Sequence, residues 1–148
     1  MVQKLIAQHD KLRELLKEMI AVANRPDGYV SISRTQESFK SVLFEHLALE
    51  NEEFYPRLIA AIGASDAPSD GVERIKRFIA GMKDIGIAVE SFLKKYADDR
   101  SIRLSWPDYK KDLAKCASLL EIRMESEEQG VYMEWEIYGA DISHWQED

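Results

Sequence analysis

The sequence predicts an all-α protein, built as an up-down-up-down four-helix bundle. Apolar residues recur with helical spacing in four long segments, and turn-forming residues separate these segments. No stretch has the alternating pattern of a strand. Helices of about 25 residues would be about 35 Å long, a normal length for such a bundle. The 148 residues suit one domain, so we expect a single bundle domain over residues 1–148, with a short tail over about 137–148.

The first two predicted helices cover residues 2–24 and about 33–63. A run of turn-forming residues between them predicts a loop near residues 25–32. Pro56 lies inside the second segment. Its ring removes a backbone hydrogen bond and clashes with the preceding turn, so we expect a kink near residues 52–56.

The third predicted helix covers residues 72–96, after a loop near 64–70. A polar connection over 97–105 then leads to the fourth helix. Ser105 is the expected N-cap of that helix, and Pro107 falls in its first turn, where a missing N–H costs nothing.

Composition excludes several classes of partner. A net charge of −7 argues against a general nucleic-acid or anionic-membrane surface, since both favour basic proteins. No apolar run approaches the roughly 18 residues that span a bilayer. The single cysteine, Cys116, can form no internal disulfide and lies on an apolar stripe, so we expect it to be a small buried hydrophobe in a cytoplasmic protein. No phosphate loop, zinc-type cysteine cluster or nucleophilic triad can be assembled, and we expect no enzymatic activity.

His46 and Glu50 form the most informative pair in the chain. They are four residues apart, so a helix places an imidazole and a carboxylate on one face. A bundle can direct such a pair inward at a metal ion. Without a ligand, an i,i+4 pair of this kind stabilises a helix by only about 0.2–0.5 kcal/mol. The chain contains only two other histidines, His9 and His144, and His144 lies in the tail.

Three runs resemble the motifs of hemerythrin-like (HHE) domains, four-helix bundles whose full members hold a di-iron site. Residues 8–12 are similar to the first-helix motif, residues 46–56 to the second-helix motif, and residues 123–132 to the fourth-helix motif. The resemblance implies ligand positions at His9, His46 and Glu50. It also implies that Glu128 replaces an aspartate ligand.

The departures from this family pattern argue against a complete site. Full members carry a histidine where Arg123 stands, and a pair of histidines on the third helix. Here the third segment has no histidine, and Arg74 and Phe78 are our candidates for those two positions. A di-iron site with five histidines cannot form, so we expect no reversible oxygen carriage. Arg123 is a permanent cation that could neutralise Glu50 or Glu128 in place of a metal.

Two functions follow, and both stay open at this point. The first is a regulatory or protein-interaction bundle that kept the fold, lost the full metal site and has no cofactor. The second is a protein that binds one iron, manganese or zinc ion through His9, His46, Glu50 and Glu128. A weaker resemblance is to bacterial bundles that bind a sigma factor.

Large aromatic residues near the end of the chain are typical of an interface. They could contact a protein partner of unknown identity or a second copy in a homo-oligomer. They could equally cap the open end of the bundle. The segment 138–145 is apolar enough that we expect it to pack onto the bundle.

Overall fold

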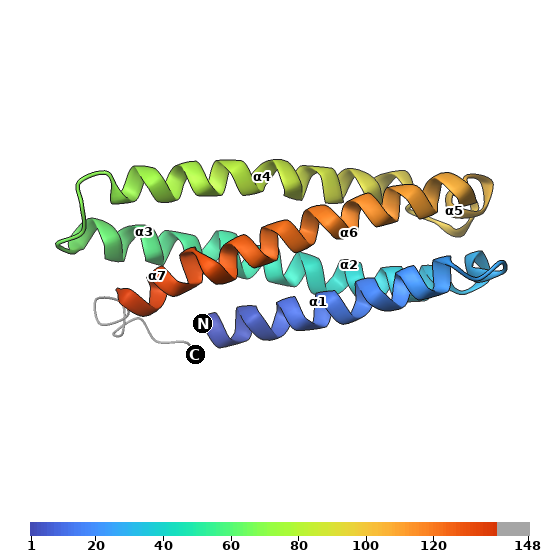
Figure 1. Ribbon diagram of the computed structural model, residues 1–148, viewed down its shortest axis with the longest axis horizontal. Helices are drawn as coiled ribbons and strands as arrows, with labels where there is room; N and C mark the ends of the chain where they lie inside the picture. The colour runs from blue at the N-terminus through green and yellow to red at the C-terminus, as the bar shows by residue number, and fades with distance from the viewer. Residues whose placement is uncertain (139–148) are drawn as a thin grey trace.

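The structure of the protein, a computed structural model, describes residues 1–138, and this part is helical without a strand. Four helical rods form an elongated antiparallel bundle, which confirms the predicted fold class (Figure 1). The rods are α1 (Val2–Ala23), α2 with α3 (Ile32–Leu49 and Tyr55–Ala64), α4 (Gly71–Lys95), and α6 with α7 (Trp106–Gln129 and Val131–Ile137). α1 packs against α2 and α6, and α4 packs against α3 and α6. None of the described helices combines the length and apolarity of a bilayer span.

The regular α-helix of the second rod is interrupted next to Pro56, near the place where the sequence predicts a kink. A π-helical segment, Glu50–Phe54, joins α2 to α3, and Pro56 lies at the start of α3. Proline has no N–H to continue the regular ladder, so the chain uses wider turns before it. This widening keeps His46, Glu50 and Phe54 on the buried face of one rod.

Two details of the predicted fourth helix and its approach were wrong. The connection predicted over residues 97–105 contains a short helix, α5 (Asp99–Leu104). Asp98 and Ser101 form a capping box at its start, and Ile102 is buried beneath it. The fourth rod is also not continuous, because it breaks at Gly130 between α6 and α7. Ser105 does occupy the N-cap position of α6, although its side chain makes no capping hydrogen bond.

The other connections follow the predicted places. The first contains a short 3-10 helix, η1 (Gly28–Val30), and the second links α3 to α4. The predicted docking of residues 138–145 concerns a segment that, apart from Tyr138, lies outside the described residues, as does His144. Tyr138 and Trp135 pack against buried apolar residues at their end of the bundle, and Trp106 does so at the opposite end.

The core consists of two apolar clusters with a buried polar layer between them. The larger cluster lies toward η1 and α5 and includes Leu12, Phe39 and Tyr109. The smaller lies toward α7 and includes Leu5 and Phe54. The polar side chains buried between the two clusters come from three rods: His9, His46, Glu50, Arg123 and Glu127. This polar layer contains the candidate site.

Candidate metal site

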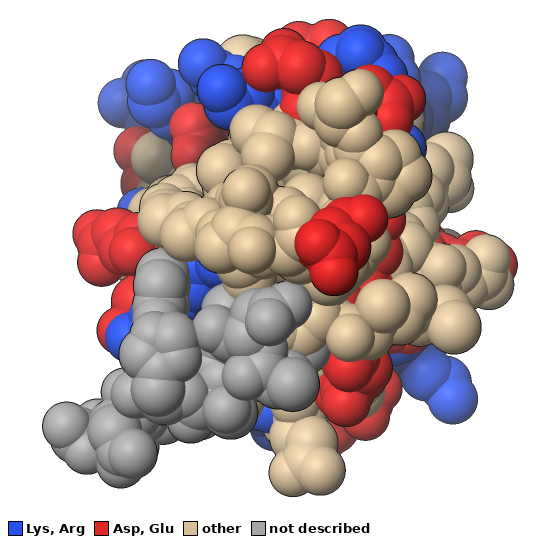
Figure 2. Space-filling model, turned by 90° about the vertical axis from the view of Figure 1, so that its left-hand side faces the viewer, with Lys and Arg blue, Asp and Glu red and all other residues tan. Residues whose placement is uncertain are grey.

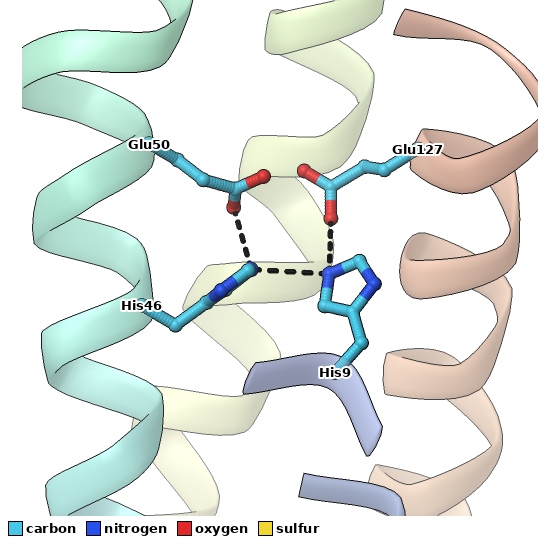
Figure 3. Close-up of side chains that lie close together, drawn as sticks. All are labelled: His9, His46, Glu50 and Glu127. Carbon is cyan, nitrogen blue, oxygen red and sulfur yellow. Dashed lines mark hydrogen bonds and ion pairs between the residues drawn. The ribbon is translucent and has the colours of Figure 1, made fainter. Parts of the chain in front are cut away.

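Four buried side chains converge in the polar layer. His9 comes from α1, His46 from α2, Glu50 from the π-helical segment and Glu127 from α6, and all four point toward one centre (Figure 3). One ligand atom from each residue lies within 4.8 Å of the other three. Each residue is at most 2% exposed, so bulk water is excluded from the group. Two imidazole nitrogens and two carboxylate oxygens therefore face one another in a dry interior.

Hydrogen bonds on the outer side orient both imidazoles. His9 Nδ1 lies 2.6 Å from Glu128 Oε2, and His46 Nδ1 lies 2.7 Å from Gln8 Oε1. Because a carboxylate and an amide oxygen accept hydrogen bonds, each Nδ1 donates and each Nε2 is left with a lone pair. These two Nε2 atoms face each other at 3.1 Å. Burial lowers the pKa of His9, although Glu128 opposes the shift. A carboxylate or amide behind a histidine is the usual support for a metal-binding imidazole.

The pKa values of the two carboxyl groups are shifted in opposite directions. Burial raises the pKa of Glu127 well above its usual value, and the neighbouring Glu50 raises it further, which favours the protonated form of Glu127. Burial also acts to raise the pKa of Glu50. Close contacts with Glu127 and His46 and the charge of Arg123 outweigh burial and lower this pKa to about 2. Glu50 is therefore the anion of the pair.

Tyrosine hydroxyls bond the outer oxygens of both carboxyl groups. Tyr132 donates to Glu50 Oε2 at 2.9 Å, and Tyr55 donates to Glu127 Oε2 at 2.7 Å. The inner oxygens face the imidazoles instead. Glu50 Oε1 lies 3.1 Å from His46 Nε2, and Glu127 Oε1 lies 3.2 Å from His9 Nε2. Glu127 Oε1 is buried and has no hydrogen-bond partner of suitable geometry among the described residues. A buried polar atom without a hydrogen-bond partner needs a physical explanation, and binding of a cation is one such explanation.

Arg123 supplies the positive charge beside this group. Its Nη2 donates to Glu50 Oε1 at 3.3 Å, and its Nε lies 3.7 Å from Glu127 Oε2. Nη1 donates to the backbone oxygen of Met82 on α4 at 3.2 Å. The side chain is buried instead of reaching the surface. Of the two carboxylates that Arg123 was expected to neutralise, Glu50 is its partner. Glu128 is paired with Arg13 instead, at 2.9 Å, on the far side of His9.

The sequence-predicted ligand set differs from this group at one position. The structure brings His9, His46 and Glu50 together, but it places Glu127 in the group and Glu128 behind His9. The inward face of α6 explains this arrangement, because its buried residues recur every three or four positions and reach 127 instead of 128: Leu113, Cys116, Leu120, Arg123, Met124 and Glu127. Extending that stripe along the sequence would have identified Glu127.

The third rod contributes no ligating side chain to the site. Arg74, our candidate for one family histidine position, forms an ion pair with Glu134 on α7. Phe78 packs against the smaller apolar cluster. Met82 and Gly86 lie across from Arg123 instead, so the register assumed from the sequence was wrong by about two turns.

The donor set fits one metal ion and does not fit two. Two imidazole nitrogens with two carboxylate oxygens suit iron, manganese or zinc. A single cation between them would also satisfy the unpartnered Glu127 Oε1. A second ion would need ligands from α4 and would lie beside the fixed charge of Arg123, where like charges repel strongly in a low dielectric.

Comparison with known proteins gives one finding. Searches of curated proteins and of solved structures gave no match. A family model described as the hemerythrin HHE cation binding domain matches residues 1–135. This match covers every residue of the metal-site group and nearly all of the described bundle. The chain therefore belongs to the hemerythrin HHE cation-binding family.

Proposed function

We propose that this protein binds a single divalent metal ion through His9, His46, Glu50 and Glu127, and that it does not carry oxygen at a di-iron centre. The observation that carries the proposal is the orientation of the two imidazoles. Both Nδ1 atoms are engaged by outer partners, so both Nε2 lone pairs point at one place, 3.1 Å apart. Two lone pairs at this distance repel unless a proton or a metal lies between them.

The residues of the group have distinct parts in binding. Glu50 is anionic before binding, whereas Glu127 must release its proton to become a ligand. Gln8 and Glu128 keep the two imidazoles in the ligating tautomer. Tyr55 and Tyr132 hold the carboxyl groups from behind. A bound ion of this class would supply Lewis acidity, or one-electron chemistry where it is iron or manganese. We assign no enzymatic reaction to the site.

A second candidate function is a metal-free regulatory or protein-interaction bundle in the cytoplasm. The observation in its favour is that Arg123 pairs with Glu50 and that burial favours the neutral form of Glu127, so the interior is close to charge balance without a metal ion. A surface for a partner protein or a second copy is available at the α7 end. Figure 2 shows that uncharged residues cover much of this end, with charged side chains mostly around them. Met133 and Ile137 of α7 are exposed there, by 57% and 71%.

Metal content separates the two candidates. Protein without a histidine tag would be purified, and bound metals measured by mass spectrometry before and after anaerobic titration with ferrous iron, Mn²⁺ and Zn²⁺. We expect one ion per chain in the wild type and greatly weakened binding in Glu127→Gln. Glu125→Gln is the matched control, because Glu125 carries the same charge on the same helix but is exposed.

Three outcomes of this experiment are informative. One ion per chain with the expected loss in Glu127→Gln supports the mononuclear site. Two irons per chain with oxo-bridged charge-transfer bands after exposure to air would refute it. Absence of stoichiometric binding for all three metals would leave the metal-free bundle as the function.

A further inference from the structure

A surface cleft of about 360 Å³ opens beside the polar layer and ends at Arg123. It lies between α4 and the junction of α2 with the π-helical segment. Leu47, Ile79 and Ile87 supply apolar walls, and Lys83 stands among the lining residues. The cleft is separate from the four-residue metal-site group, and no ligand is needed there for the proposed metal binding.

Gly86 leaves the guanidinium accessible from this cleft. A Cβ atom placed on Gly86 would lie 3.0 Å from Arg123 Nη1, which is tighter than nine in ten real Cβ contacts. Gly81, one and a half turns earlier on the same helix, would meet nothing within 4 Å. Any side chain at position 86 would therefore cover the charged group at the floor of the cleft, whereas a side chain at 81 would not.

Arg123, which lines the cleft, also retains hydrogen-bonding capacity. A guanidinium has five N–H donors in a planar fork. Within the described residues, Arg123 makes two hydrogen bonds, one from Nη1 to Met82 and one from Nη2 to Glu50. Its side chain is 7% exposed, so an anion that reached it would be largely removed from water. Lys83 adds a positive charge to the lining, and Glu90 adds a negative one. Arg123 is thus the only buried charge that the cleft presents among the described residues.

We propose that this cleft binds a small organic carboxylate with a short apolar chain. The carboxylate engages the free edge of the Arg123 guanidinium, whose planar fork matches its geometry. The chain lies against Leu47, Ile79 and Ile87. The inference is independent of the proposed metal site, because it rests on Arg123, Gly86 and the walls of the cleft alone.

Binding can be tested in metal-free protein, so that its failure is distinguishable from failure of the metal proposal. Metal would be removed with phenanthroline, which has no carboxylate, followed by desalting. Acetate, butyrate and hexanoate would be titrated while amide and arginine Nε–H signals are followed by NMR. We expect saturable shifts at residue 86 and at the Arg123 Nε–H, with affinity rising from acetate to hexanoate. Butanol should bind at least tenfold more weakly than butyrate.

The variants Gly86→Leu and Gly81→Leu form a matched pair. Both add the same side chain to α4, but only Gly86→Leu fills the space before Arg123. We expect Gly86→Leu to lose at least tenfold in butyrate affinity and Gly81→Leu to match the wild type. Equal affinity in the two variants would overturn the proposal. So would the absence of saturable binding in the wild type, or inorganic phosphate binding as tightly as butyrate. If Gly86→Leu does not fold, Arg123→Lys keeps the charge without the planar fork and should show the same loss.

Discussion

Two buried polar networks lie in this bundle, and they are satisfied in different ways. Toward the η1 end, the Gln36 amide donates to the backbone oxygen of Tyr96 at 2.7 Å and accepts from the Tyr109 hydroxyl at 2.7 Å. Donor meets acceptor in each contact, and Gln36 needs no charge. In the metal-site group, two imidazole nitrogens and two carboxyl oxygens face inward together. These inward-facing nitrogens and oxygens all act as hydrogen-bond acceptors, so they are stabilised only by a proton or another cation between them.

We propose that this difference separates a structural network from a functional one. A neutral network in which every donor has an acceptor links the helices and needs no bound ion or ligand. The metal-site group obtains positive charge from Arg123, and burial favours the protonated form of Glu127, yet Glu127 Oε1 still has no hydrogen-bond partner among the described residues. Buried polar groups without a full set of hydrogen-bond partners are therefore candidates for a binding site.

The largest expected effect comes from removing the fixed cation. Arg123→Met leaves Glu50 buried without its charge partner, and we expect the free energy of unfolding to fall by about 3–5 kcal/mol. The double variant Arg123→Met with Glu50→Gln should recover part of this loss, because no uncompensated charge remains. Urea unfolding of metal-free protein measures both. The control is Arg77→Met on the exposed face of α4, and a loss no larger than that of the control would contradict the charge-balance argument.

Metal binding should stabilise the folded state by a somewhat smaller amount. At one hundred times the dissociation constant, a single bound ion adds about 2.7 kcal/mol to the free energy of unfolding. Glu128→Gln should weaken binding by about 10–100-fold, although Glu128 is not a ligand, because it supports His9 from behind.

Thermal unfolding with and without metal measures this stabilisation. Glu121→Gln is the control, since Glu121 also bonds Arg13 but does not touch the described histidines. Equal metal affinity in Glu128→Gln and Glu121→Gln would show that Glu128 has no supporting part.

Acid should destabilise the metal-free protein through Glu50. The folded-state pKa of Glu50 is about 2, below its usual value of 4.5. A carboxyl group with a lowered pKa stabilises the fold above its unfolded-state pKa, and this contribution is lost as the pH falls toward the folded-state value. We therefore expect the free energy of unfolding to decline between about pH 4.5 and about pH 2. Glu50→Gln should show a flatter profile in this window, whereas Glu52→Gln at an exposed neighbouring position should follow the wild type.

The smallest effect is expected in the neutral network. Gln36→Leu leaves the Tyr109 hydroxyl and the Tyr96 carbonyl without a buried partner, which should cost about 1–3 kcal/mol. The variant should nevertheless gain as much stability from metal as the wild type does. If its metal-dependent gain were reduced, the two networks would be coupled and the contrast between them would not hold.

The sequence by itself determined the helical rods and placed His46 and Glu50 on one face of the second helix. Helical periodicity and turn residues predicted the rods, because an apolar stripe can be buried only in a bundle. Pro56 predicted an irregular segment near Glu50, because proline lacks the N–H needed for the regular hydrogen bonds of an α-helix. His9, His46 and Glu50 were identified as a group from motif resemblance, and the structure brings them together.

Only the tertiary structure decided which neighbour on α6 faces the centre, and which residues of α4 stand opposite Arg123. Adjacent residues on a helix differ by about 100° in direction. A rotation of α6 by about 100° about its axis would therefore exchange Glu127 for Glu128, and the orientation of α6 is set by the packing of the whole rod. Likewise, sliding α4 by two turns along its neighbours exchanges Arg74 and Phe78 for Met82 and Gly86. Rotation and sliding are properties of contacts between rods, and the spacing of residues within one rod does not contain them.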